Sequence, residues 1–167
     1  MESTGSYGTL YESSINISTG GGNNNYGVSL GNGLKIGYNL FQCSKPCDDN
    51  NWKNIDTDKK IQDISADGSY IYMTDTDNIL WRCPGGCSSG NWEKDPVGSA
   101  KKVDASGDRY LRVIGSDNML WERDKRKWGQ EWTPTNKVIS SMSMSNTHMP
   151  FLVNEDVEGM LWTIEPN

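Results

Sequence analysis

Long apolar runs and recognisable targeting signals are missing from this sequence. No segment approaches the roughly 18 consecutive apolar residues that a membrane-spanning helix needs, so we expect no insertion into a membrane. The polar N-terminal segment has no basic region followed by an apolar run, so no signal peptide is visible. We expect a secreted or cell-surface protein, with the cytoplasm as the alternative.

Positive charge is also in short supply. The chain has 16 Lys and Arg against 22 Asp and Glu, a net charge of −6. A protein that binds nucleic acid normally carries a basic surface that displaces counterions from phosphates, so we expect no nucleic-acid partner. The basic run at 123–127 is interpreted as a solvated turn between two strands, with a patch that binds polyanions as the alternative.

The residue patterns of common active sites are absent. His148 is the single histidine, and it lies in a polar segment. The sequence has no nucleophile elbow and no metal-ligating motif. We therefore predict that the protein is not an enzyme and needs no cofactor and no metal.

Runs of Leu, Ala and Glu are absent too, which makes long helices improbable. The 167 residues instead include 18 Gly and 7 each of Trp and Tyr, besides many Asn, Asp and Ser. This composition is typical of short strands joined by tight turns, and the length suits one domain.

A repeat of about 40 residues organises the chain. Trp52, Trp92 and Trp132 are spaced by 40 residues. A Leu-aromatic pair recurs at nearly the same interval, and its members are Leu40-Phe41, Leu80-Trp81, Leu120-Trp121 and Leu161-Trp162. Such a period indicates a repeat architecture.

Each unit divides into four short strands separated by turn sequences, which is the pattern of a β-propeller blade. The first strand of each unit is rich in small residues, as a crowded axis requires. We predict an all-β fold in one domain over 1–167, a small β-propeller of about four four-stranded blades whose ring is closed by the N-terminal strand. A dimer or part of a larger ring is the alternative. The units are approximately 16–56, 59–95, 101–135 and 136–167, the last completed by 8–13.

Two cysteine pairs follow the first two Leu-aromatic pairs. Cys43 and Cys47, like Cys83 and Cys87, are four residues apart, so a disulfide forms within each pair only if the chain reverses between its members. The intervening residues suit such a reversal. Disulfides that pin two hairpins are the favoured interpretation, and they imply an oxidising setting; free thiols and a zinc site are the alternatives.

The segments "LFQCSKPCDDNNW", "KKVDASGD" and "SDNMLW" resemble the tectonin repeat, which occurs in tachylectin-type and fish egg lectins. The resemblance covers about residues 10–165. It implies a propeller lectin that binds cell-surface or bacterial glycans in shallow sites repeated around the ring, as an agglutinin of innate immunity. Weak single sites then gain avidity through multivalency. A protein-interaction scaffold without sugar binding is the alternative function, and we also consider a homo-oligomer.

The candidate ligand-binding residues come from the third strand of each unit and the turn before it. The aromatic residues either pack between blades or stack on a sugar, and Trp128 is expected to be the exposed aromatic. The turn residues either serve the backbone or bind sugar hydroxyl groups, and the arginines are candidates for acidic sugars or phosphates. The candidates are Phe41, Trp81, Trp121, Trp162, Asp77, Asn78, Asp117, Asn118, Arg82 and Arg123.

Overall fold

The computed structural model describes residues 14–19, 24–30, 38–44, 52–55, 58–67, 69–84, 87, 91–105, 109–144, 150–153 and 161–163. Apart from one 3-10 turn, η1 (Lys125–Lys127), the regular elements among these residues are all strands. The prediction of an all-β fold is thus confirmed. None of these elements is a helix long and apolar enough to cross a membrane.

The strands form four separate antiparallel sheets, and within each sheet every strand pairs with the next along the chain. Three of the sheets have four strands, as predicted for blades. The first sheet is β1 (Ser14–Thr19), β2 (Asn24–Leu30), β3 (Tyr38–Ser44) and β4 (Trp52–Ile55); the second is β5 (Ile61–Ala66), β6 (Tyr70–Asp75), β7 (Leu80–Pro84) and β8 (Glu93–Lys94). The third is β9 (Ala100–Asp104), β10 (Tyr110–Gly115), β11 (Met119–Asp124) and β12 (Thr133–Val138), and the fourth is β13 (Ser141–Met144), β14 (Pro150–Val153) and β15 (Leu161–Thr163).

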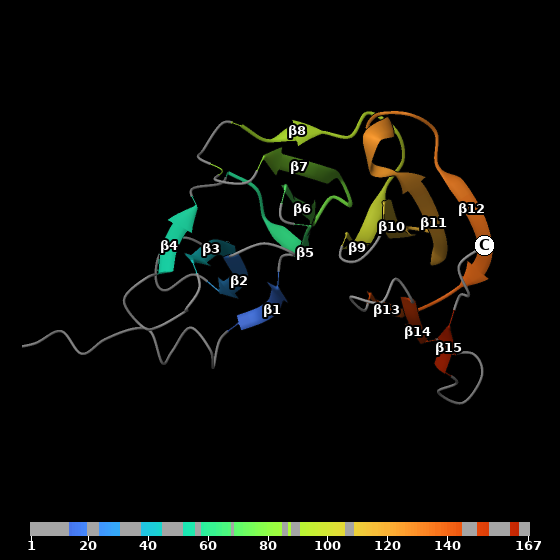
Figure 1. Cartoon of the computed structure of the whole chain (residues 1–167), viewed down its shortest axis with the longest axis horizontal. Helices are drawn as coiled ribbons and strands as arrows, with labels where there is room; N and C mark the ends of the chain where they lie inside the picture. Colours follow the sequence, from blue (N-terminus) through green and yellow to red (C-terminus); the bar gives the residue numbers. More distant parts are fainter. Residues whose placement is uncertain are drawn as a thin grey trace, which may run out of the picture.

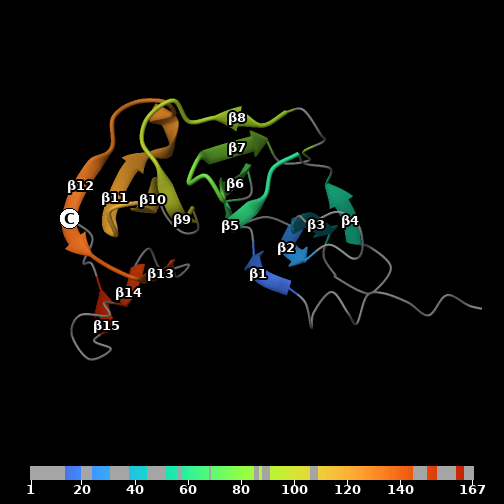
Figure 2. The ribbon, with the colours of Figure 1, turned by 180° about the vertical axis from the view of Figure 1, so that it is seen from behind.

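The sheets follow one another along an arc, which is seen from both sides in Figure 1 and Figure 2. The first strand of each sheet lies on the inner side of the arc, and β4, β8 and β12 lie on the outer side (Figure 1). The segments that the structure describes form no closed ring. The strand expected at 8–13, which was predicted to close the ring, lies outside the described residues.

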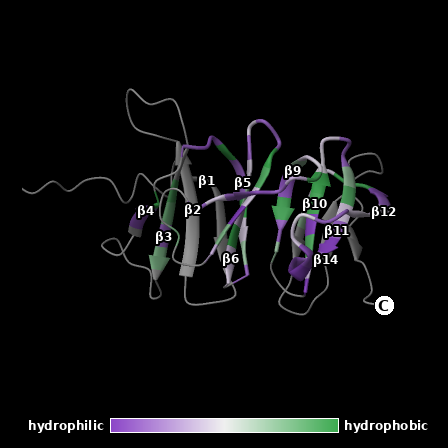
Figure 3. Cartoon of the chain, turned by 90° about the horizontal axis from the view of Figure 1, so that it is seen from above, coloured by the Kyte–Doolittle hydropathy of each residue, from purple (hydrophilic) through white to green (hydrophobic). Residues whose placement is uncertain are grey.

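The core is divided among the interfaces between neighbouring sheets. Leu40, Leu80 and Leu120 are almost fully buried, and each belongs to a different interface cluster. Figure 3 shows the hydrophobic residues concentrated on the strands, where they alternate with hydrophilic ones, and mostly hydrophilic residues in the coloured connections. Burial of each leucine contributes roughly 1.5–3 kcal/mol. The Leu-aromatic pair therefore places its leucine in the core of every repeat whose side chains are described.

The inner strands β5 and β9 are also joined by polar contacts. The Val103 amide donates to Asp63 Oδ2 at 2.8 Å, and the Ala105 amide donates to Ser65 Oγ at 2.9 Å. Each donor lies 40 residues after its acceptor. These bonds satisfy buried amides that no strand ladder reaches.

The turns before the third strands join each sheet to the next in a second way. The Ala100 amide donates to the Asn78 carbonyl at 2.7 Å, and the Ile139 amide donates to the Asn118 carbonyl at 3.0 Å. Asn78 and Asn118 have φ angles of 61° and 63°, in the left-handed region that Asn tolerates better than most residues. Their backbone role is thus observed directly.

Cys83 and Cys87 form a disulfide across 6.0 Å between their Cα atoms, as predicted. Cys43 is also disulfide-bonded, while its expected partner Cys47 lies outside the described residues. The third repeat has no cysteine. There Arg123 takes the position of Cys83 and is equally buried.

Candidate functional site

A cavity of about 270 Å³ lies between the second and third sheets. Its wall is formed by the end of β10, the start of β11, and the segments that lead into β9 and β12. Two of its residues are tryptophans. The lining residues are Leu80, Asp95, Val97, Gly98, Ser99, Ala100, Val113, Gly115, Ser116, Asp117, Trp121, Glu131 and Trp132.

Trp121 is held in the cavity wall by the turn that precedes β11. Its Nε1 donates to Asp117 Oδ1 at 3.3 Å, and the same oxygen accepts from the Met119 amide at 3.0 Å. The left-handed Asn118 closes this turn, with its amide 3.0 Å from the Gly115 carbonyl. Trp121 also packs against the core between the second and third sheets. The packing interpretation of this aromatic is therefore observed, and its contact with a ligand stays a prediction.

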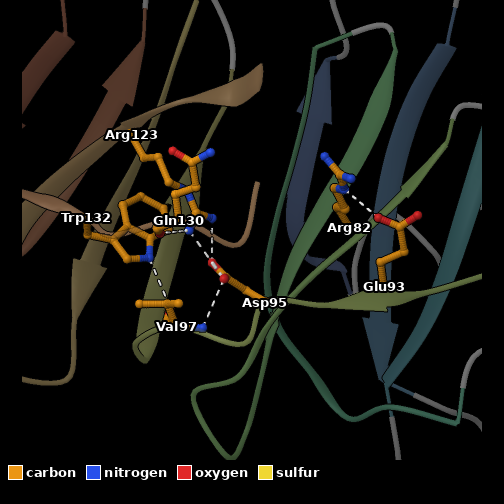
Figure 4. A network of polar contacts seen from close by, with 7 residues as sticks. All are labelled: Arg82, Glu93, Asp95, Val97, Arg123, Gln130 and Trp132. Carbon is orange, nitrogen blue, oxygen red and sulfur yellow. Dashed lines mark hydrogen bonds and ion pairs between the residues drawn. The ribbon is translucent and has the colours of Figure 1, made fainter. Parts of the chain in front are cut away.

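Trp132 is held by a polar network that crosses between the second and third sheets (Figure 4). Its Nε1 donates to the Val97 carbonyl at 3.0 Å, and the Arg123 guanidinium lies 4.0 Å from the ring centroid. Arg123 donates to both carboxylate oxygens of Asp95 and to the Gln130 carbonyl. The indole is thus fixed along its edge and on one face.

Hydroxyl and carboxylate groups complete the cavity. Ser99 Oγ lies 2.8 Å from Ser116 Oγ, and Asp117 and Glu131 are exposed. Asp95, the third carboxylate of the wall, is neutralised by Arg123. The described lining residues include no Lys, Arg or His. The cavity therefore offers aromatic surface, hydroxyl groups and a net negative charge.

The predicted residues of the second repeat do not line this cavity. Trp81 is half-buried against the core between the first two sheets, Asn78 serves its turn, and Asp77 is exposed. Of the other aromatic candidates, Phe41 is half-buried on β3, and Trp162 belongs to β15 with a side chain outside the described residues.

Both candidate arginines make ion pairs within the protein. Arg82 Nε lies 2.7 Å from Glu93 Oε2, and the Arg123 side chain is only 2% exposed. The two guanidinium groups lie over the ring of Trp128, at 4.5 and 5.2 Å from its centroid. The expectation that Trp128 is the exposed aromatic is wrong: it is half-buried beneath these cations.

Sequence reasoning identified Trp121 and Asp117 as candidates but did not include Trp132, Ser99, Gly115 or Glu131, although Trp132 was noted as a member of the 40-residue repeat. Ser99 precedes β9 and Gly115 ends β10, two strands that pair at Ala100 and Gly115, and Glu131 lies in the segment before β12 of the same sheet. A signal was nevertheless present, because Gly115 differs from its counterpart 40 residues earlier, Asp75. In the part of the chain with described side chains, no group of three or more His, Cys, Asp or Glu residues is placed to hold a metal ion.

No family model matches the chain, and no curated protein matches it. Similar solved structures do exist. A structure of YCF48 bound to D1 peptide has a TM-score of 0.61 at 15% identity and covers 93% of this chain and 52% of that one. YCF48 from Cyanidioschyzon merolae has a TM-score of 0.59 at 13% identity, with 93% and 53% covered.

Human WBSCR16 has a TM-score of 0.56 at 7% identity, with 92% of this chain and 53% of that one covered. The chain thus spans about half the length of each of these structures. Identities this low bear on the fold alone. Since YCF48 is a β-propeller, the comparisons support the conclusion that this chain is an all-β protein whose antiparallel sheets are arranged as propeller blades.

Proposed function

We propose that the protein is a non-enzymatic lectin that binds cell-surface or microbial glycans in the cavity between the second and third sheets. The observation that carries this proposal is the meeting of Trp121 and Trp132 with the hydroxyl groups of Ser99 and Ser116 and the carboxylate of Glu131. Sugar recognition needs an apolar surface beside fixed hydrogen-bonding groups, and ligand sites generally combine the two. The resemblance to the tectonin repeat supports the same function.

The charge of the cavity narrows the class of glycan. Asp117 and Glu131 are exposed carboxylates, and no described lining residue balances them. Acidic sugars and phosphates would be repelled, whereas neutral sugars and amino sugars would not. We therefore propose neutral or amino sugars as ligands, in place of the acidic ligands first considered for Arg82 and Arg123.

Glu131→Ala tests the proposal. Glu131 is exposed and makes none of the contacts that hold the tryptophans, so we expect the variant to fold normally. Loss of one hydrogen bond from a charged acceptor would weaken glycan binding by about tenfold. A glycan array identifies the ligand, and calorimetry then compares the wild type, Glu131→Ala and the control Gln130→Ala. Equal affinity in all three would refute the site.

We also propose that a strand at 8–13 pairs with β15 and closes a four-bladed ring. The support is that β15 lies at an edge of its sheet, and exposed strand edges are usually covered. Deletion of residues 1–13 should then clearly lower the melting temperature. The full chain should be a monomer when its mass is measured by light scattering. An unchanged melting temperature would contradict this closure, and a dimer would favour a larger ring.

The alternative function is a protein-interaction propeller without sugar binding. The observation that favours it is that one structure of the same fold, YCF48, was solved with a bound peptide. Haemagglutination with sugar competition separates the two functions. Agglutination that no glycan inhibits would favour the scaffold.

A further inference from the structure

The second and third repeats differ at the residues that surround their equivalent tryptophans. Trp81 and Trp121 occupy the same place in β7 and β11, 40 residues apart. At the same interval, Asp75 corresponds to Gly115. The pairs Ile61–Asp75 and Ala100–Gly115 place Lys59, two residues before Ile61, at the position of Gly98. These two differences determine how much space lies beside each indole.

In the second repeat the carboxylate beside the indole comes from Asp75, at the end of β6. Its side chain is buried. It accepts from the Asp77 amide at 3.0 Å, the Ile79 amide at 2.9 Å and Trp81 Nε1 at 2.8 Å. Asp75 thus occupies the space under the turn and satisfies its donors from within.

In the third repeat two of the three equivalent donors are satisfied by a different residue. Asp117, two positions later along the turn, accepts from the Met119 amide and from Trp121 Nε1. A Cβ atom at Gly115 would lie 2.4 Å from Asp117 Oδ1 and 3.0 Å from Trp121 Nε1. Gly115 does not have a left-handed φ, so it is required for space, and that space is part of the cavity.

The faces of the two indoles differ as well. Lys59 Nζ lies 4.3 Å from the centroid of the Trp81 ring, a distance at which an ammonium group is held by the π-system. In the third repeat this position is Gly98, which has no side chain and lines the cavity together with Trp121. A lysine thus covers the first indole, whereas a glycine takes its place beside the second.

We propose that the residues equivalent to 98 and 115 decide which blade of this protein has a binding site. Gly98 and Gly115 open the site at Trp121, and Lys59 with Asp75 closes the equivalent site at Trp81. The inference rests on the proposed function for the sugar nature of the ligand, but the open and closed states are properties of the repeats themselves. The number of binding sites is then set by these two positions and is smaller than the number of repeats.

Two variants test this assignment in opposite directions. Gly115→Asp copies the carboxylate of the second repeat into the third, and Lys59→Gly/Asp75→Gly makes the opposite exchange. Because loss of Asp75 removes three hydrogen bonds, Lys59→Ser alone provides an opening variant that keeps the turn intact. Asn54→Asp, on exposed β4, is the control for added negative charge.

The first measurement needs no sugar. The neutral nitroxide TEMPOL enhances the relaxation of protons that it can approach, and the ring signals of the tryptophans are assigned with single Trp→Phe variants. In the wild type we expect stronger enhancement at Trp121 than at Trp81. We expect this difference to shrink in Gly115→Asp, and the enhancement at Trp81 to rise in Lys59→Ser. Equal enhancement of both rings in the wild type, or an unchanged Trp121 in the closing variant, would overturn the inference.

The second measurement adds methyl glycosides of glucose, galactose, mannose and N-acetylglucosamine. We expect a binding glycoside to shift the indole signal of Trp121 but not that of Trp81. The closing variant should bind this glycoside at least about tenfold more weakly, and the control Asn54→Asp should bind it with the affinity of the wild type. Equal shifts at both indoles would overturn the inference. If no glycoside binds while TEMPOL gives the expected pattern, the inference stands and the proposed lectin function fails.

Discussion

Arg123 shows how one residue can replace a covalent link. It lies where the second repeat has Cys83, and its guanidinium joins Asp95, the Gln130 carbonyl and the Trp132 ring. The Arg123 and Asp95 side chains are 2% and 1% exposed. A buried ion pair of this kind is expensive to desolvate, but loss of one partner leaves the other charge buried and unpaired.

We therefore expect Arg123→Met to lower the free energy of unfolding by about 3–5 kcal/mol. The double variant Asp95→Asn/Arg123→Met should recover part of this loss, because no buried charge remains. Arg82→Met breaks the more exposed ion pair with Glu93, and loss of this pair should lower the free energy of unfolding by about 1 kcal/mol or less. Urea denaturation measures all three, and an Arg123→Met cost no larger than that of Arg82→Met would refute the argument.

At the scale of the strand and turn, much of the structure could be predicted from the sequence. The 40-residue spacing of the Leu-aromatic pairs identified the strands that carry Leu80 and Leu120, and short-range geometry identified the Cys83–Cys87 reversal. The cavity could not be predicted in the same way. It depends on contacts between segments that are distant in the sequence, such as Ser99 with Ser116 and Trp132 with the Val97 carbonyl, and local patterns do not determine which of these groups meet.

The contact between strands β5 and β9 should make stability depend on pH. Burial raises the pKa of Asp63 to about 6, although the Val103 amide and the charge of Lys102 oppose this and Asp104 adds to it. In the unfolded chain the pKa is about 3.9. Between about pH 4 and 6 the folded state therefore binds more protons than the unfolded state, so stability is lost as pH rises through this window.

The loss attributable to Asp63 is on the order of 3 kcal/mol. Asp63→Asn keeps an oxygen acceptor for the Val103 amide but cannot ionise, so it should remove this component. The measurement is the difference in unfolding free energy between wild type and variant, taken from pH 4 to pH 7. A difference that does not change with pH would show that Asp63 titrates alike in both states.

At the scale of the whole molecule, each hydrophobic cluster is shared between neighbouring sheets. The cluster with Leu40 and Ile71 draws on the first two sheets, and the cluster with Leu80 and Leu111 draws on the second and third. Repeats that share interfaces stabilise one another, and their unfolding is coupled when the interfaces contribute more than the repeats themselves. We expect a single cooperative transition for the sheets.

Far-ultraviolet circular dichroism and tryptophan fluorescence should therefore give coincident urea curves. The two signals report on different parts of the chain, since circular dichroism follows all strands and fluorescence follows the tryptophan-rich interfaces. Leu80→Ala should shift both curves together, with a cost of about 2–5 kcal/mol. Two separated transitions would mean that single sheets unfold independently.

The bonds from Asp63 to the Val103 amide and from Ser65 to the Ala105 amide have one more consequence. They fix the position of β9 along β5, although the two strands belong to different sheets and share no backbone hydrogen bonds. Loops between these strands can therefore lengthen or shorten freely, while a single residue inserted within β5 or β9 would break both links at once. Tolerance to insertion should for this reason differ sharply between the outer connections and the inner strands.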